Sequence, residues 1–391
     1  MKILFLTRWY PTSDHTYAGV FVREHAKAVR AAGHDVAVVH IPGVPTDGPG
    51  PWRMERETDP ALTEGIPTYH VYQRPMPVGP IPFVSRGLFY LIYVWSALRA
   101  FRRLRGRGFR PDLVHAHVFT AGVPAVVIGK LFGLPVVVTE HFTGFYDGSL
   151  GPGGARRARF AFENAARVLP VCASLQRAIS AHGIRADFEV VPNAVDTGIF
   201  FTSDRTAQPG EPKRLVFVGN LEPTHQKGFP TLVEALIRLR GRRTDWRLDV
   251  VGEGPARADY ERLVADSDLS SSVVFHGAKG KPEVAEMMRA ADAFVLPSRL
   301  ENLPCVIIEA MTSGLPVVST TVGGIPEMVS DDDGVLVPPD DPAALADALG
   351  RMLSDLGSFD RGGIAARARA RYSLETVGVQ LSAIYDSVLS R

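Results

Sequence analysis

Residues 294–329, FVLPSRLENLPCVIIEAMTSGLPVVSTTVGGIPEMV, hold the pattern that decides the fold. A short apolar strand at 293–296 leads into a polar turn with Glu301, then a helix with Glu309, and then a buried strand at 315–319. Ligands of open α/β sheets bind outside the carboxyl ends of the strands, where this pattern places both carboxylates. Each carboxylate can accept two hydrogen bonds from a diol, which favours a sugar as the ligand.

A second pair of glutamates at the same spacing tests how much the spacing means. Glu253 and Glu261 are also eight residues apart, but Glu261 lies on the charged helix ADYERLVADSD. Such a helix is typical of a solvated face. The strand and helix context, rather than the spacing, therefore distinguishes Glu301 and Glu309.

The segment also resembles a known family signature. Glu301, seven intervening residues, Glu309, Ala310-Met311 and Gly314-Leu315-Pro316 are similar to the signature of retaining glycosyltransferases of the family-4 type. That family has the GT-B architecture. The resemblance implies two Rossmann-like domains facing across a cleft, with a C-terminal helix that crosses back to the N-terminal domain.

Length and composition limit the class of protein. The 391 residues, 46% hydrophobic and 22% charged, predict two globular domains. The net charge of +1 provides no general electrostatic attraction to nucleic acid. Two cysteines, Cys172 and Cys305, cannot build a disulfide framework or a cysteine-based zinc site. MKILFLTR is too short for a signal-peptide core, and no apolar run approaches the ~20 residues of a spanning helix. We expect a cytoplasmic protein.

Alternating strands and helices predict two doubly wound domains with parallel sheets. We expect an N-terminal, acceptor-binding domain at 1–196 with a returning helix at 372–391, and a nucleotide-sugar-binding domain at 197–371. The polar, turn-prone residues between Asn193 and Pro212 are interpreted as the linker. Expected strands lie at 2–7, 36–41, 68–72, 113–116, 136–139, 168–171, 189–191, 214–218, 247–251 and 273–276. Expected helices lie at 20–32, 86–104, 229–240, 256–266, 283–290 and 372–389.

The segment FVGNLEPTHQKG, residues 217–228, predicts a phosphate site. It leaves a strand and places Lys227 at the start of a helix. A cation there opposes the helix dipole unless an anion lies between them, and a diphosphate is the simplest such anion. A plain surface lysine is the alternative. The family carries an arginine after the strand's glycine, where this chain has Asn220, and His225 stands nearby as a partial replacement.

The resemblance implies roles for further residues on the donor side. Glu309 would bind the ribose hydroxyls, and Glu301 would face the donor sugar and the diphosphate. Gly252 and Gly277 follow neighbouring strands and would form walls of the base pocket, although ordinary turns are an equal interpretation. The backbone that begins the helix would stabilise the departing charge; it comprises Leu303, Pro304 and Cys305.

Residues of the first half are expected at the acceptor and the reacting centre. Gly19 matches a small-residue pair of the family, with Ala18 as a departure, although a loop glycine is an equal interpretation. His141 matches the family's active-site histidine, which touches the donor sugar. Asn193 in PNAVD resembles an architectural turn that orders the cleft floor, and His117 is expected on the acceptor side.

Two histidines share one strand end. We expect His115 to point to the opposite face from His117 and to be a packing residue. The pair could also begin a metal site, but the sequence fixes no third ligand.

The implied reaction moves a hexosyl group from a UDP- or GDP-linked sugar to a hydroxyl of a glycan, lipid-linked or small-molecule acceptor, with retention. Same-face attack is expected, without metal or cofactor, and the catalytic residues would be His141, Glu301 and Lys227. Asp331-Asp332-Asp333 is interpreted as a surface turn rather than a metal motif.

Three other functions are compatible with parts of the sequence. A sugar-nucleotide-binding relative without catalysis remains open because of Asn220. A nicotinamide or flavin enzyme is disfavoured, since no strand is followed by G-x-G-x-x-G. A phosphorylase-like enzyme is disfavoured because no lysine context for a pyridoxal cofactor is found.

Residues 83–110 raise the question of a membrane. They contain seven arginines and no acidic residue, beside an apolar run. A basic amphipathic helix could lie on the inner face of a membrane, near a lipid-linked acceptor. The alternative, which we favour, is a helix that packs on the N-terminal sheet with a solvated basic end.

Overall fold

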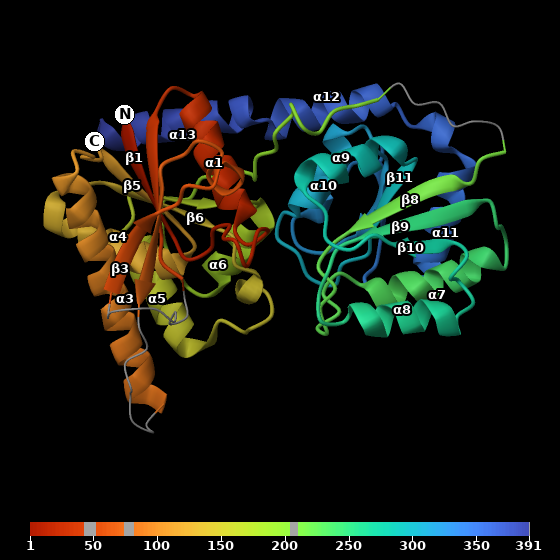
Figure 1. Cartoon of the computed structure of the whole chain (residues 1–391), viewed down its shortest axis with the longest axis horizontal. Helices are drawn as coiled ribbons and strands as arrows, with labels where there is room; N and C mark the ends of the chain where they lie inside the picture. Colours follow the sequence, from red (N-terminus) through yellow and green to blue (C-terminus); the bar gives the residue numbers. More distant parts are fainter. Residues whose placement is uncertain (43–51, 74–81, 204–209, 391) are drawn as a thin grey trace. The chain divides into compact units, whose positions relative to one another are not determined.

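The computed structural model describes residues 1–42, 52–73, 82–203 and 210–390 (Figure 1). The chain forms two compact units. Unit 1 comprises Met1–Ala194 with Leu374–Arg391, and unit 2 comprises Val195–Ser373. The boundaries expected from sequence lay two residues away, after 196 and before 372. Residues 204–209 of the expected linker lie outside the described residues, as do 43–51 and 74–81 of the Pro- and Gly-rich region.

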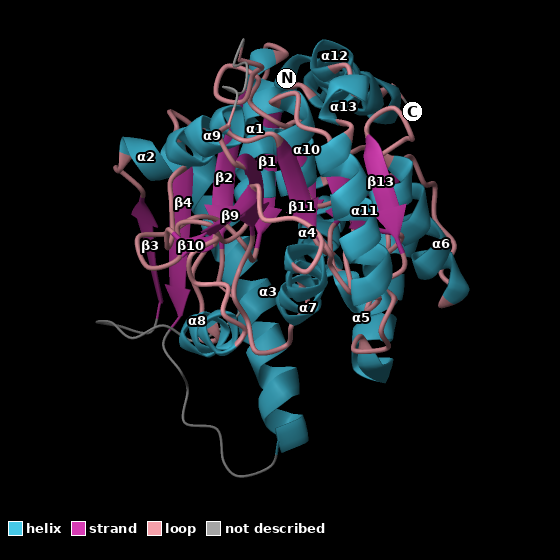
Figure 2. Ribbon diagram, turned by 90° about the vertical axis from the view of Figure 1, so that its right-hand side faces the viewer, coloured by secondary structure: helices cyan, strands magenta, loops and turns pink. Residues whose placement is uncertain are grey.

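Unit 1 is built on one seven-stranded sheet of order β3-β4-β2-β1-β5-β6-β7. All neighbours are parallel except the edge pair β3 and β4, visible side by side in Figure 2. The central strands are buried along nearly their whole length, as expected of a parallel sheet covered on both faces. The strands are β1 (Lys2–Thr7), β2 (Asp35–His40), β3 (Trp52–Arg56), β4 (Thr68–Gln73), β5 (Leu113–His117), β6 (Val136–Glu140) and β7 (Arg167–Pro170).

The helices of unit 1 connect these strands and cover the sheet. They are α1 (Val20–Ala31), α2 (Pro60–Thr63), α3 (Pro82–Gly106), α4 (Phe119–Phe132), α5 (Gly151–Glu163), α6 (Ala173–Ala181) and α13 (Leu374–Leu389), with a short 3-10 turn, η1 (Thr143–Phe145). No helix in the described part of the chain is long and apolar enough to cross a membrane.

One strand expected in unit 1 is absent. Residues 189–191 form no strand, although the amides of Glu189 and Val191 donate to carbonyls of β7. Pro192 follows at once and has no N–H to continue such a ladder. Conversely, β3 was not expected, because its Pro- and Gly-rich surroundings give little periodicity.

The returning helix α13 packs against α1 (Figure 1), so this part of the fold prediction is confirmed. Gly378 allows the close approach, since a Cβ there would lie 2.3 Å from the carbonyl oxygen of Ala28. Polar contacts fix the register: His34 Nε2 lies 2.8 Å from Ser382 Oγ, and Gln380 donates to the carbonyl of Val190. The helix thereby completes the apolar core of unit 1.

Unit 2 is built on a six-stranded parallel sheet of order β10-β9-β8-β11-β12-β13. Numbered within the unit, this is the doubly wound order 3-2-1-4-5-6, so the prediction of two such domains is confirmed. The strands are β8 (Lys213–Val218), β9 (Trp246–Val251), β10 (Val273–Phe275), β11 (Ala293–Leu296), β12 (Val317–Thr320) and β13 (Gly334–Val337).

Helices lie on both faces of this sheet, with α7 and α8 on one side and α9 and α10 on the other (Figure 1). They are α7 (Phe229–Arg240), α8 (Arg257–Asp266), α9 (Lys281–Ala290), α10 (Cys305–Thr312), α11 (Pro342–Ser354) and α12 (Arg361–Tyr372). Short 3-10 turns are η2 (Ile325–Glu327) and η3 (Leu356–Ser358).

Several boundaries in unit 2 differ from expectation by one or two residues, and two of these differences have a clear physical cause. β12 begins at Val317 rather than Leu315, because Gly314, at φ 75°, turns the chain and Pro316 has no N–H. Tyr372 ends α12 instead of beginning the last helix, since Ser373 is extended (φ −62°, ψ 155°) and breaks the helical path.

Candidate active site

The carboxyl edge of unit 2 brings the predicted donor residues to the switch point of its sheet. β8 and β11 are adjacent and parallel, and the sequence order of the strands reverses between them. The loop at 219–228 follows β8, and the loop at 297–304 follows β11. In doubly wound sheets this is where ligands bind.

Lys227 and Glu301 form an ion pair at that point. Lys227 Nζ lies 2.6 Å from Glu301 Oε1, which also accepts a hydrogen bond of 2.9 Å from Ser298 Oγ. The Glu301 side chain is buried, whereas the Lys227 side chain is 24% exposed. The lysine is therefore held, but it keeps a face that an anion can reach.

Backbone contacts fix the two loops against each other. Arg299 donates its backbone N–H to the carbonyl of Gln226, and the Gln226 side chain donates to the carbonyl of Leu300. Gly228, at φ 69°, caps α7, and a Cβ there would lie 1.8 Å from the carbonyl oxygen of Pro297. Only glycine fits this contact, which places Lys227 beside Glu301.

Glu309 lies on α10, buried, with Lys281 of α9 at 3.8 Å. Pro304 caps this helix and Cys305 begins it, while Leu303 is buried just before it. Glu309 is five residues into α10, so its carboxylate is fixed by the helix rather than by a loop.

Gly252 follows β9 and approaches the loop after β8. A Cβ on Gly252 would lie 1.9 Å from the carbonyl oxygen of Gly219. Gly277 follows β10 at φ 71° and accepts a hydrogen bond from the amide of Gly252. The loops after three neighbouring strands are thus packed backbone to backbone.

The side chains between these loops are exposed or paired. Asn220 is exposed, and His225 points to α8, where its Nδ1 lies 2.8 Å from Tyr260 Oη. Glu253 and Glu261 both bind Arg257, at 2.6 and 2.8 Å. This second pair of glutamates therefore forms a surface ion-pair cluster on α8.

The acidic run before β13 is a turn. Asp331 and Asp332 are exposed, and Asp333 is buried in a hydrogen-bonded ion pair with Arg367 at 2.7 Å. Asp333 also accepts hydrogen bonds from Ser330. Its carboxylate is thus already satisfied by protein groups.

In unit 1 the switch point lies between β1 and β5. Gly19, at φ 65°, caps α1 after the long loop that follows β1, and a Cβ there would lie 2.3 Å from the backbone of Trp9. Glycine is therefore required for packing of the loop on itself.

The histidines after β5 and β6 come together. His117 Nδ1 and His141 Nε2 are 3.2 Å apart, with their rings stacked, and Asn193 hydrogen-bonds to His141. Phe21 packs on the His141 ring, with 4.1 Å between the centroids. Three predicted residues of unit 1, namely His117, His141 and Asn193, therefore form one cluster.

The expected orientation of His115 is wrong. Its ring stacks on that of His117, with centroids 4.5 Å apart. Residues two apart on a strand share a face, since side chains alternate with a period of two. His115 is nevertheless a packing residue: its ring nitrogens lie 2.6 Å from Tyr385 Oη of α13 and 2.7 Å from Thr139 Oγ1.

Burial keeps this histidine cluster uncharged. It lowers the pKa values of His115, His117 and His141 well below their ordinary range, and neighbouring imidazoles lower them further. It also lowers the pKa of His25, on α1, to about 4. At neutral pH these rings are neutral, so each has one N–H and one lone pair.

Glu140 orders the backbone beside the cluster. Its carboxylate accepts hydrogen bonds from the backbone N–H groups of Phe119, His141 and Phe142, at 2.7–2.8 Å. Burial raises the pKa of Glu140 to about 7. The side chain ties the start of α4 to the segment that carries His141.

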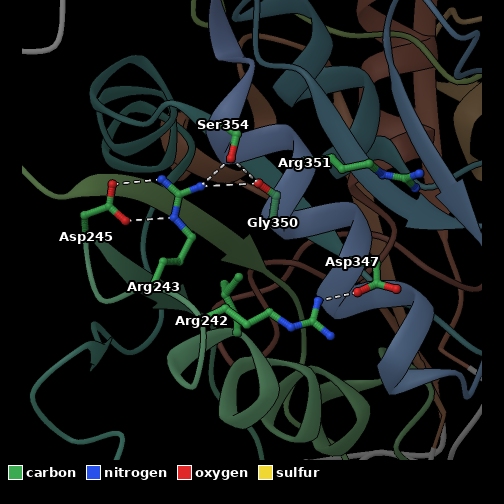
Figure 3. A pocket seen from close by; sticks show the side chains of 8 residues that line it. Arg242, Arg243, Asp245, Asp347, Gly350, Arg351 and Ser354 are labelled. Atoms are coloured by element: carbon green, nitrogen blue, oxygen red, sulfur yellow. Dashed lines mark hydrogen bonds and ion pairs between the residues drawn. The ribbon is translucent and has the colours of Figure 1, made fainter.

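A pocket of about 690 Å³ lies elsewhere on unit 2, between α7 and α11 (Figure 3). Two of its three arginines are paired locally: Arg243 binds Asp245 and Ser354, and Arg242 binds Asp347 (Figure 3). None of the predicted site residues lines it.

Two family models match the chain. The model described as "Glycosyl transferase 4-like domain" matches residues 18–194, and the model described as "Glycosyl transferases group 1" matches residues 212–355. The chain is a glycosyltransferase of the family-4 type. The second match includes both switch-point loops of unit 2, and the first includes His117, His141 and Asn193.

Curated relatives agree with this assignment. The glycosyltransferase is 31% identical to a D-inositol 3-phosphate glycosyltransferase of Arthrobacter sp. (strain FB24), over 67% of each chain. It is 28% identical to a glycogen synthase of Mycobacterium tuberculosis, over 98% of this chain and 94% of that protein. The chain is also 29% identical to the MMP alpha-(1->4)-mannosyltransferase of Mycolicibacterium hassiacum, over 100% of this chain and 99% of that protein.

Solved structures share the fold. Sucrose-phosphate synthase from Thermosynechococcus elongatus matches with a TM-score of 0.76 at 21% identity, over the whole of both chains. Anabaena HepE, in complex with UDP and glucose, matches with a TM-score of 0.74 at 22% identity, over 99% of this chain and all of that one. The predicted GT-B architecture is confirmed by these neighbours.

Sequence reasoning missed several residues of this glycosyltransferase. His25 is hidden among the apolar positions of α1, and Glu140 resembles an ordinary polar strand end. Lys281 contacts Glu309 from a different helix. A role for Gly323 could have been predicted in part, because two consecutive glycines after β12 suggest that another backbone segment approaches closely there. A Cβ on Gly323 would lie 1.8 Å from the carbonyl oxygen of Glu301.

Proposed function

We propose that this glycosyltransferase moves a hexosyl group from a UDP- or GDP-linked sugar to an acceptor hydroxyl, with retention of the anomeric configuration. The observation that carries the proposal is the Lys227–Glu301 pair at the switch point of unit 2. A cation at the start of a helix suits a diphosphate, and a carboxylate beside it suits sugar hydroxyls.

On the donor side, Lys227 and the backbone at the start of α10 neutralise the diphosphate as it leaves. Glu309 binds the ribose, and Gly252 and Gly277 line the base. Asn220 carries no charge where the family has arginine, so Lys227 is the principal cation for the phosphate. The close packing of the loops around Gly228 and Gly252 supports a pre-organised site.

At the reacting centre the proposed route is same-face attack. The bond between the sugar's anomeric carbon and the diphosphate oxygen breaks, the acceptor oxygen bonds to that carbon, and the leaving oxygen takes the acceptor's proton. His141, which His117 and Asn193 contact, is the residue proposed to bind the donor sugar, through a neutral ring. No metal or cofactor takes part, and the protein contributes positioning and charge stabilisation.

The acceptor is a glycan, a lipid-linked sugar or a small molecule. The relatives differ in this respect: one is named for glycogen, and another for D-inositol 3-phosphate. Unit 1 contributes Gly19, His117 and Asn193 to this side.

A membrane-bound acceptor would give α3 a role. Leu91 and Trp95 are exposed on this helix, but Arg99 packs on the rings of Trp52 and Trp95. We favour packing within unit 1. Vesicle flotation on anionic liposomes should give the same result for the wild type and for a variant with Arg102, Arg103 and Arg105 changed to Glu. A salt-sensitive loss of flotation in the variant would favour the membrane instead.

The test is a thermal-shift screen against nucleoside diphosphates and sugar nucleotides, followed by a transfer assay with the donor that binds. Glu309→Ala should abolish the shift and the transfer, while Glu261→Ala, which removes a surface carboxylate, should change neither. Nuclear magnetic resonance of the product reports the anomeric configuration. Binding without transfer to any acceptor or to water would instead support a non-catalytic sugar-nucleotide-binding protein.

A further inference from the structure

Three histidines of unit 1 converge from separate elements. His25 lies on α1, His117 ends β5, and His141 follows β6. One ring nitrogen of each lies within 4.8 Å of those of the other two. Among the described residues this is the one group of three or more histidine, cysteine or acidic side chains that is placed to share a metal ion.

The hydrogen bonds of His25 leave a ligand atom available. Its Nε2 lies 2.9 Å from the carbonyl oxygen of Pro192, which can only accept, so Nε2 carries the proton. The ring is fully buried, and its Nδ1 meets no hydrogen-bond partner within the described chain. Metal-binding histidines commonly donate their other N–H to a backbone carbonyl in this way.

His117 offers a second such atom. Its Nδ1 contacts His141, while its Nε2 is buried and has no hydrogen-bond partner in the described residues. His115 is not available to join them, because both its nitrogens are engaged with Tyr385 and Thr139. A buried nitrogen without a partner costs free energy that a ligand would recover.

We propose that His25, His117 and His141 form a three-histidine site for a divalent transition metal, with Zn²⁺ as the reference ion. Imidazole nitrogen suits Zn²⁺, Co²⁺, Ni²⁺ and Cu²⁺, whereas Mg²⁺ requires oxygen ligands. The half-buried edge of His141 gives access, and a water molecule would complete a tetrahedron.

The geometry requires only side-chain adjustment. Three nitrogens of a tetrahedral zinc site, at about 2.0–2.1 Å from the metal, lie about 3.3 Å apart. One ring nitrogen of each histidine already lies within 4.8 Å of those of the other two, so each pair has to close by at most about 1.5 Å. Each neutral ring has one nitrogen with a lone pair for the metal and one that carries the proton, so the three rings can bind without net proton release.

Metal binding would inhibit transfer, a consequence that rests on the proposed function. His141 is the residue assigned to the donor sugar, and a metal would hold its ring and occupy the space in front of it. The metal is thus an inhibitor that binds through residues of the reacting centre, and it takes no part in the transfer itself.

The test uses the full-length chain without an affinity tag, treated with chelator. Co²⁺ titration should give the intense visible absorption of a four-coordinate site at one equivalent, and Zn²⁺ should displace it; Mg²⁺ should not bind. His25→Gln retains an N–H for the Pro192 carbonyl but lacks the ligand, and it should weaken Zn²⁺ binding at least 100-fold. His117→Ala should do the same, and His15→Ala, which removes an exposed histidine of unit 1, should have no effect.

Two results would overturn the site: no Co²⁺ binding, or stoichiometric binding that survives both His25→Gln and His117→Ala. Circular dichroism confirms that these variants are folded. Binding of Co²⁺ by a protein that transfers no sugar would refute the proposed function and leave the metal site standing. Transfer that micromolar Zn²⁺ inhibits in the wild type but not in His25→Gln supports both.

Discussion

The Lys227–Glu301 pair makes a prediction that can be measured without any substrate. The contact is 2.6 Å long, Glu301 is buried, and a charge-assisted hydrogen bond of this kind contributes about 1.5–3 kcal/mol. Lys227→Met removes the cation and leaves the buried carboxylate with the hydrogen bond from Ser298 Oγ, so we expect that variant to lose about 3 kcal/mol of unfolding free energy. Glu301→Gln keeps the shape of the side chain and should cost less.

A double-mutant cycle isolates the pair. We expect an interaction energy of about 2 kcal/mol between Lys227→Met and Glu301→Gln. The matched control is Arg242 with Asp347 on the same unit, an ion pair whose side chains are 59% and 55% exposed. The cycle of Arg242→Met with Asp347→Asn should give a much smaller interaction energy, because solvent screens an exposed ion pair.

The assay must resolve unit 2 from unit 1, because two compact units need not unfold together. Urea-dependent hydrogen exchange, read by mass spectrometry on peptides from residues 210–373, provides this. An interaction energy no larger than that of the control pair would refute the argument that this contact organises the site. With a nucleoside diphosphate present, Lys227→Met should also weaken binding at least about tenfold, while Glu301→Gln should not.

Three further predictions follow from the packing and the burial. Gly228→Ala should destabilise unit 2 by more than 2 kcal/mol in urea unfolding, because its Cβ would lie 1.8 Å from the carbonyl oxygen of Pro297. The control is Gly133→Ala, which has a similar φ of 65° but no atom within 4 Å of the added Cβ, and it should cost about 1 kcal/mol. Glu140→Ala should lower the free energy of unfolding of unit 1 by several kcal/mol, since it leaves three backbone N–H groups without their acceptor. Glu140→Gln keeps one oxygen and should cost less. Equal losses of stability in the two variants would contradict this account. Unit 1 should lose stability as the pH falls from 7 to 5, because its buried histidines bind protons only when unfolded: for His25, whose pKa falls from 6.5 to about 4, the loss at pH 5 is about 2 kcal/mol. Glu140, with its pKa raised to about 7, acts in the opposite direction and offsets about one histidine. Unit 2, whose two histidines are not buried, should retain its stability in the same hydrogen-exchange experiment.

The sequence predicted those parts of the fold that depend on local patterns. The apolar run at 293–296 became β11 within the expected bounds, and α7 matches its prediction residue for residue. Segment 189–191 has the composition of a strand and donates two hydrogen bonds to β7, but Pro192 has no N–H to continue the ladder. β3 has too little periodicity to be recognised alone, because it depends on antiparallel pairing with β4.

In the candidate site, too, local patterns identified individual residues but not the contacts between distant ones. Glu301 and Glu309 were identifiable from their place in a strand, turn and helix. The contact of Glu301 with Lys227 joins residues 74 positions apart, and that of His25 with the Pro192 carbonyl joins residues 167 apart. Such distances in sequence carry no local signal. The orientation of His115 was readable from strand periodicity and was simply misassigned.

The course of the chain has a consequence for folding during synthesis. The polypeptide leaves unit 1 after Ala194, builds all of unit 2, and returns at Leu374 to supply α13. Until that last segment leaves the ribosome, α1 lacks the partner that covers its apolar face, and His115 lacks the hydroxyl of Tyr385. Unit 2, although later in sequence, is contiguous and can fold first. The nascent N-terminal part of unit 1 therefore remains without α13, and partly exposed, during about half of translation.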